Sequence, residues 1–96
     1  MILKEANLII ENDNNEQEIK RVMDSFDVTV VNSVLLDLNI TENFTLPALS
    51  DIVEMFNGFL NDDTRVAVKT TINDELSQSF VTVKFSDKQD EFDDVK

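Results

Sequence analysis

The chain has 96 residues, of which 20 are acidic and 8 are basic, so its formal net charge is −12. This length suits one domain with a single hydrophobic core. An acidic surface is repelled by the phosphates of nucleic acids and of anionic membranes, so we expect neither as a partner. The chain has no histidine and no cysteine, which excludes thiol and histidine-dependent catalysis, structural zinc and disulfides.

Glycine is almost absent, and Gly58 is the single example. Both common types of phosphate-binding loop need several glycines, so neither can be present. The apolar run at the N-terminus contains Glu5 and lacks a small-residue cleavage site, unlike a secretion signal. No apolar run approaches the ~20 residues of a membrane span. We therefore expect a cytoplasmic protein without a cofactor.

The first part of the chain predicts a strand followed by a helix. Residues 2–10 alternate between apolar and polar side chains, which is typical of a strand. After a polar turn, Asn14 is placed to cap a helix, with Gln17 three residues later as in a capping box. The helix predicted over residues 15–26 carries one apolar stripe, formed by Ile19, Val22, Met23 and Phe26.

Residues 28–40 predict a long strand, because the run is apolar and rich in β-branched residues. Val31 and Leu35 point away from its main apolar face, which indicates a central strand buried on both sides. Thr45 can then cap a second helix, with Pro47 tolerated in the first turn. The apolar face of this helix is formed by Leu49, Ile52, Val53, Phe56, Phe59 and Leu60.

Two alternating runs, residues 64–72 and 79–85, predict two further strands. The loop 73–78 between them predicts an antiparallel hairpin. We expect one domain over residues 1–86, followed by an acidic, disordered tail over residues 87–96. The order β-α-β-α-β-β predicts an α+β two-layer sandwich, a four-stranded sheet with two helices on one face.

Carboxylates are the only abundant reactive groups. The adjacent acids at 62–63 and 74–75 occupy turns, and their spacing does not place two acids across a cleft. A calcium loop starting at Asp13 would need glycine at its sixth position, where Glu18 stands. We therefore assign no catalytic, metal-binding or cofactor-binding residue, and a small enzyme that uses carboxylates alone stays an open alternative.

Four residues are candidates for binding a protein partner. Phe80 alternates with apolar neighbours, which places it on the sheet face opposite the helices. Lys69 and Lys84 are expected on that face too, and an exposed aromatic near lysines makes an adhesive patch on an acidic protein. Phe92, alone among the acids of the tail, is a second possible anchor.

Several stretches carry a resemblance to a known family. They are the strand VLLDL at 34–38, the strand DDTRVAVKT at 62–70, the turn NDEL at 73–76 and the strand VTV at 81–83. Between the first two lies a helix with Leu46, Leu49, Ile52, Phe56 and Phe59. In this order they resemble the C-terminal domain of the bacterial tubulin homologue FtsZ. Lys69 departs from the family, which usually has glycine there.

The resemblance implies a non-catalytic assembly domain of the tubulin-like cell-division proteins. Its partner would be a protein, either a tubulin-like subunit or a division regulator. The family's nucleotide-binding domain and the loop that completes GTP hydrolysis have no counterpart here, so the resemblance implies no GTPase activity for this chain alone. The charge of −12 leaves a second hypothesis, an acidic regulator or nucleic-acid-mimicking decoy that binds a basic protein.

Overall fold

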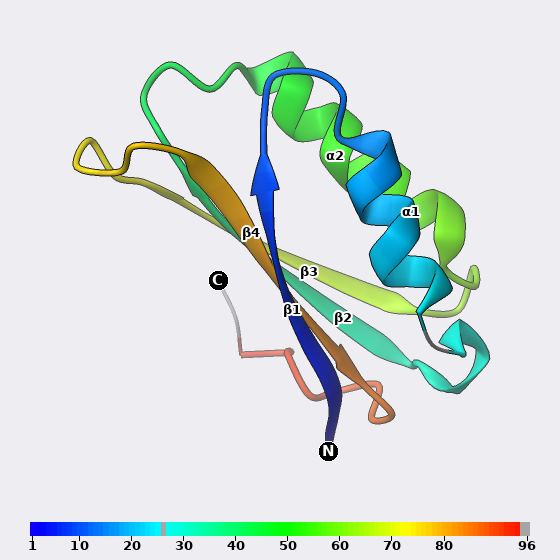
Figure 1. Cartoon of the computed structure of the whole chain (residues 1–96). Helices are drawn as coiled ribbons and strands as arrows, with labels where there is room; N and C mark the ends of the chain where they lie inside the picture. The colour runs from blue at the N-terminus through cyan, green and yellow to red at the C-terminus, as the bar shows by residue number, and fades with distance from the viewer. Residues whose placement is uncertain (26, 95–96) are drawn as a thin grey trace.

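The computed structural model describes residues 1–25 and 27–94. Within them, the strands form one mixed sheet in the order β1-β4-β2-β3, and both α-helices lie on the same face of it (Figure 1). The predicted α+β sandwich and its β-α-β-α-β-β order are confirmed. The elements are β1 (Ile2–Ile10), α1 (Glu16–Asp24), the 3-10 turn η1 (Val28–Val30), β2 (Ser33–Ile40), α2 (Leu46–Phe59), β3 (Arg65–Ile72) and β4 (Ser79–Ser86).

The predicted hairpin between the last two strands is wrong. β4 lies between β1 and β2 and is antiparallel to both, whereas β3 is parallel to β2 on the other side. The loop after β3 therefore passes the end of β2, where the N–H of Asn73 donates to the carbonyl of Ile40 at 2.9 Å. A strand in the middle of the sheet is covered by neighbours on both sides, and the inner residues of β4 are accordingly 0% exposed: Val81, Val83 and Phe85.

The core fills the space between the sheet and the two helices. Phe56 of α2 and Ile19 of α1 are both 0% exposed, which confirms the apolar stripes predicted for the two helices. Apolar burial of this kind stabilises a fold by roughly 25 cal/mol per Å². The other core residues at 0% are Val34, Leu36, Leu38 and Ile52, together with the three β4 residues named above. In the described part of the chain, no helix is long and apolar enough to cross a membrane.

The strand predicted over residues 28–40 is shorter in the structure, where β2 begins at Ser33. The carboxylate of Asp27 accepts a hydrogen bond from the N–H of Thr29 at 3.0 Å and caps the 3-10 turn that precedes the strand. Val31 joins the core on the helix side instead of the opposite side. Leu35 does face away from the helices and is 7% exposed, so the prediction that β2 is buried on both faces is confirmed.

The helix α2 begins as predicted. The hydroxyl of Thr45 accepts a hydrogen bond from the N–H of Ala48 at 3.3 Å, and Pro47 lies in the first turn. The backbone N–H of Thr45 donates to the side chain of Asn12 at 3.1 Å, which ties this helix to the loop after β1.

The helix α1 begins differently from the prediction. Its N-cap residue is Asn15, not Asn14, and no side chain caps the first turn. The Asn15 amide is bonded instead to the N–H and the carbonyl of Glu11, at 2.8 and 2.7 Å. Asn14 adopts a φ of 64°, a left-handed conformation that asparagine tolerates. Phe26, predicted at the end of the apolar stripe, lies outside the described residues.

Candidate functional site

The sheet face turned away from the helices is called the open face here. Since side chains alternate along a strand, the residues between those of the core form this face. They are Glu5, Asn7 and Ile9 of β1, Phe80, Thr82 and Lys84 of β4, Ser33, Leu35, Asp37 and Asn39 of β2, and Arg65, Ala67, Lys69 and Thr71 of β3. Three of the four predicted partner-binding residues therefore share one face of the sheet.

Phe80 lies near one end of the open face. The strand register places it between Ile9 and Asn39, and its side chain is half-buried. Ile9 is 58% exposed. A shallow pocket of about 510 Å³ opens beside these side chains and is lined also by Leu76 from the loop after β3. We call the group formed by Phe80, Ile9 and Leu76 the Phe80 patch.

The two lysines lie away from the Phe80 patch. Lys84 is on the same strand beyond Thr82, with Glu5 and Leu35 as its cross-strand neighbours. Lys69 is on β3, where its neighbour in register is Asp37 of β2. Each lysine thus has one carboxylate beside it in the sheet, and neither is adjacent to Phe80 in the strand register.

Phe92 lies over the other end of the open face. Residues 87–94 form turns on the side of the sheet away from the helices (Figure 1), and Phe92 is 8% exposed. A pocket of about 320 Å³ beside its ring is lined by Ser33, Arg65 and Ala67 among others. This differs from the expectation of a solvated tail. The reason is tertiary, because side chains that β2 and β3 bring together line this pocket with Phe92.

Polar contacts accompany this burial. The Oγ of Ser33 donates to the carbonyl of Lys88 at 2.5 Å. Nη1 of Arg65 lies 2.9 and 3.0 Å from the two carboxylate oxygens of Asp93. The Nδ2 of Asn32 donates to a third point in the segment, the carbonyl of residue 87, at 2.6 Å. The segment is therefore held at several points along its length.

The start of the chain also contacts this segment. The amino group of Met1 lies 2.9 Å from Glu91 and 3.3 Å from Asp87. The hydrogen bond to Glu91 raises the pKa of the amino group above its ordinary value, and the same bond lowers the pKa of the Glu91 carboxyl. In addition, the Oγ of Ser86 donates to the carbonyl of Met1 at 2.9 Å. Met1, which precedes β1, and the segment that follows β4 are thus joined at one corner of the sheet.

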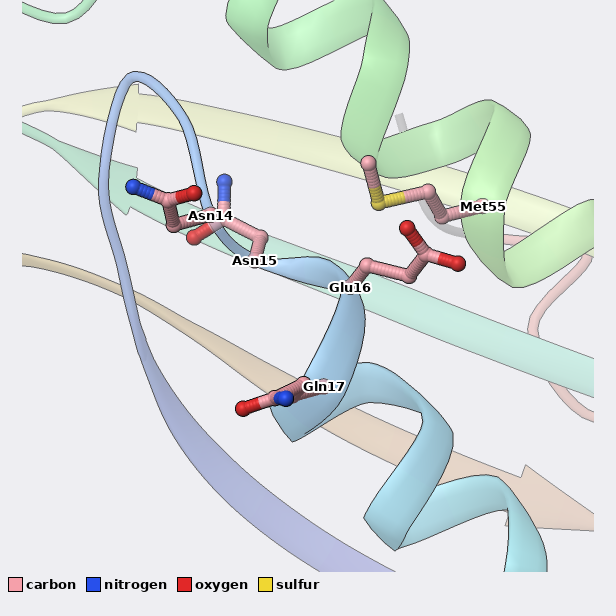
Figure 2. Close-up of a pocket in the computed structure, with 5 residues that line it drawn as sticks. All are labelled: Asn14, Asn15, Glu16, Gln17 and Met55. Carbon is pink, nitrogen blue, oxygen red and sulfur yellow. The ribbon is translucent and has the colours of Figure 1, made fainter.

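A further pocket, of about 420 Å³, lies between the start of α1 and Met55 of α2 (Figure 2). Figure 2 shows Glu16 extending toward Met55, while Gln17 points away from it. Glu16 and Glu18 place two carboxylates in the first turn of α1, where they complement the positive end of the helix. A phosphate would meet these negative charges, so the pocket is unsuited to nucleotide phosphates.

In the part of the chain that the structure describes, the acidic side chains do not gather into a metal site. Over residues 1–25 and 27–94, no three acidic side chains are placed to hold a metal ion. Every buried side-chain nitrogen and oxygen in those residues has a hydrogen-bond partner. Two surfaces of the described chain carry exposed or separately buried apolar side chains, the Phe80 patch and the surface under Phe92, which is formed by Ser33, Arg65 and Ala67.

Comparison with known proteins shows that this fold occurs in other solved structures. No family model and no curated protein sequence matches the chain. Among solved structures, the chain is similar to the FtsZ dimer of M. jannaschii, with a TM-score of 0.64 and 14% identity over 88% of this chain. It is also similar to TubZ of Bacillus thuringiensis serovar israelensis, crystallised as GDP-form protofilaments, with a TM-score of 0.66 and 12% identity over 86% of this chain.

The fold is that of part of FtsZ and TubZ. The match covers 26% of the FtsZ chain and 25% of the TubZ chain, so this protein spans about a quarter of their length. A similar fold occurs in E. coli HypE, a hydrogenase maturation protein, with a TM-score of 0.54 and 8% identity over 85% of this chain and 30% of HypE. The predicted resemblance to FtsZ is confirmed at the level of the fold.

Proposed function

We propose that the chain is a non-catalytic protein-interaction domain that contacts its partner through the open face. The observation that carries this proposal is the Phe80 patch. Ile9 is 58% exposed and flanks a half-buried aromatic ring beside a pocket of about 510 Å³. Exposed apolar groups with an aromatic at their centre are typical of protein-binding surfaces.

A catalytic role has little chemical support. The chain has no histidine, no cysteine and one glycine, so it lacks the usual nucleophile-base pairs and glycine-rich phosphate loops. The first turn of α1 carries Glu16 and Glu18, which would repel a triphosphate. The chain also spans only about a quarter of FtsZ and of TubZ. These observations support a chain that neither binds nor hydrolyses GTP.

The partner we propose is another protein in the cytoplasm. The similar FtsZ structure is described as a dimer and the similar TubZ structure as protofilaments. Both are assemblies of tubulin-like subunits, which favours a tubulin-like subunit or a cell-division regulator as the partner of this chain.

The test compares two alanine variants as bait in affinity purification from a bacterial extract. Phe80→Ala removes the centre of the Phe80 patch, and we expect at least a five-fold loss of the co-purified partner. Leu46→Ala is the matched control, since Leu46 is 77% exposed and lies on α2, on the helix side of the sheet. The control should retain the partner. If Phe80→Ala unfolds the domain, Phe80 is part of the core and the proposed face is wrong.

Salt separates this proposal from the acidic-decoy hypothesis. The charge of −12 would make binding to a basic protein fall steeply as the ionic strength rises. Contacts through the Phe80 patch are apolar and should persist in 0.5 M salt, a Debye length of about 4 Å. The decoy hypothesis would be favoured if the wild-type chain loses its partner in 0.5 M salt and the Phe80→Ala variant still binds the partner at low salt.

A further inference from the structure

We propose that the surface under Phe92 is a docking site for acidic peptides that carry an aromatic residue, and that residues 87–94 occupy it within the chain until a partner's segment displaces them. The site lies on the open face, so the inference deepens the proposed function, but it does not involve the Phe80 patch. The chain's own segment shows which chemistry the surface accepts.

The apolar part of the site is separate from the main core. Leu35 is 7% exposed and Phe92 is 8% exposed, yet neither belongs to the cluster packed between the sheet and the helices. By strand register Leu35 shares the open face with Ala67 and Lys84, and the helices lie on the other face of the sheet (Figure 1). The segment over residues 87–94 lies on this side of the sheet (Figure 1), and Phe92 lines a pocket with Ala67 and Arg65 of β3 and Ser33 of β2.

The polar part of the site recognises two further features of the segment. Ser33 donates its hydroxyl hydrogen to a backbone carbonyl, that of Lys88, at 2.5 Å. A backbone carbonyl is present in any peptide, so this bond does not depend on the sequence of the ligand. Arg65 contacts the carboxylate of Asp93, one residue after the ring, at 2.9 and 3.0 Å. The site therefore recognises a carboxylate next to an aromatic side chain.

Local charge favours the same class of ligand. The protein is acidic as a whole, but β3 contains Arg65 and Lys69 and no acidic residue. The segment that lies beside it, DKQDEFDD over residues 87–94, contains five acids and one lysine. Arg65 pairs with Asp93 of the segment across the contact, and an acidic peptide from a partner would find the same complementarity.

The attachment is suited to exchange. Phe92 is the single large apolar residue among residues 87–94. Arg65 and Asp93 have side chains that are each 55% exposed, and such pairs are weak in water. A competing peptide binds only those molecules in which the chain's own segment has left the site. The apparent affinity of the peptide is therefore its intrinsic affinity multiplied by the fraction of open molecules. Releasing the segment should therefore increase binding.

The experiment is an NMR titration of the labelled full-length chain with a synthetic peptide, SDKQDEFDD, which copies residues 86–94. The receptor is the Phe92→Ala variant, in which the site is vacated. We expect saturable shifts at Ser33, Leu35, Arg65 and Ala67, and at least ten-fold weaker binding to the wild-type chain. A second receptor, Asp93→Lys, replaces the ion pair with repulsion from Arg65, which weakens the attachment of the segment, and it keeps the test valid if Phe92→Ala does not fold.

Two controls define the ligand class. A peptide in which alanine replaces phenylalanine should cause no saturable shift. In the Phe92→Ala background, Arg65→Gln should weaken binding at least five-fold, whereas Lys20→Gln, which removes an exposed charge from α1, should leave it unchanged. The proposal is overturned if shifts are absent at millimolar peptide, if they fall outside the site, or if the wild-type chain binds equally well. It is also overturned if the wild-type chain is a dimer and Phe92→Ala a monomer, because the segment then acts between two copies.

The Phe80→Ala chain separates this inference from the proposed function. After a further Phe92→Ala change, it should bind the peptide as the single Phe92→Ala variant does. If the peptide fails to bind while Phe80→Ala still loses its partner, only the docking site is wrong. If the peptide binds and Phe80→Ala keeps its partner, only the role of the Phe80 patch is wrong.

Discussion

The guanidinium of Arg65 and the carboxylate of Asp93 form an ion pair across 28 positions of the sequence, with Nη1 at 2.9 and 3.0 Å from the two oxygens. Arg65 begins β3, and Asp93 lies in the turns after β4. Both side chains are 55% exposed, and exposed pairs contribute at most about 1 kcal/mol. The segment therefore depends mainly on the burial of Phe92 for its position.

Phe92→Ala should lower the free energy of unfolding by about 1–2 kcal/mol. A buried Phe→Ala change costs about 3–5 kcal/mol in a core, but a terminal segment opens locally, so its loss costs no more than its own opening free energy. Urea denaturation followed by circular dichroism measures the change. A loss above about 3 kcal/mol would mean that residues 87–94 belong to the cooperative core.

Phe56→Ala should be more damaging, with a loss of about 3–5 kcal/mol. Phe56 is 0% exposed at the centre of the core between α2 and the sheet. The same urea titration gives the value, and Leu46→Ala on the exposed side of the same helix should change stability by less than about 0.5 kcal/mol. Similar losses in the two variants would contradict the orientation of α2.

The Asp27 carboxyl should titrate below its ordinary range. The hydroxyl of Thr29 and then its backbone N–H donate to Asp27 Oδ1, at 2.5 and 3.0 Å, and these bonds lower the pKa of the carboxyl. Because the folded pKa is lowered, the stabilisation is complete above the unfolded value, about 3.9, and is lost as the pH falls through the folded pKa.

Thr29→Val tests this relationship, since it removes the hydroxyl and keeps the shape of the side chain. The pKa of Asp27, measured by NMR titration of its carboxyl carbon, should rise toward its ordinary value. The difference in melting temperature between wild type and Thr29→Val should be present at pH 6 and should shrink below about pH 4. An unchanged Asp27 pKa in the variant would show that the hydroxyl does not stabilise the carboxylate.

The isolated chain should not bind GTP in isothermal titration with Mg²⁺ present. Glu16 and Glu18 in the first turn of α1 would repel the phosphates of GTP. With a single glycine, the sequence also cannot form a glycine-rich phosphate loop. Saturable heat in this titration, or phosphate release on incubation with GTP, would overturn the non-catalytic proposal. The control is a nucleotide-binding protein of known affinity in the same buffer.

Part of the candidate site could be predicted from the sequence and part could not. Alternation along residues 79–85 places Phe80 and Lys84 on the open face, because a strand turns successive side chains to opposite sides. The position of Phe92 depends on Ser33 of β2 and on Arg65 and Ala67 of β3, which line the pocket beside it. One signal was present, since an apolar Leu35 on the second face of β2 indicates that something covers that face.

Apart from residues 28–32, which precede β2 and include a 3-10 turn, the sequence by itself determined which segments are helices and strands. It did so because periods of 3.6 and 2 residues are local properties. It also determined the cap of α2, since Thr45 and the N–H of Ala48 are three residues apart. Only the tertiary structure decided that β4 enters between β1 and β2, because strand pairing depends on which arrangement buries the most apolar surface. β3 can lie at the edge of the sheet because it carries the polar side chains of Lys69, Thr70 and Thr71. β4 is buried at the centre because its inner side chains are apolar, namely Val81, Val83 and Phe85. The two strands compete for these places only when all four strands are in one sheet.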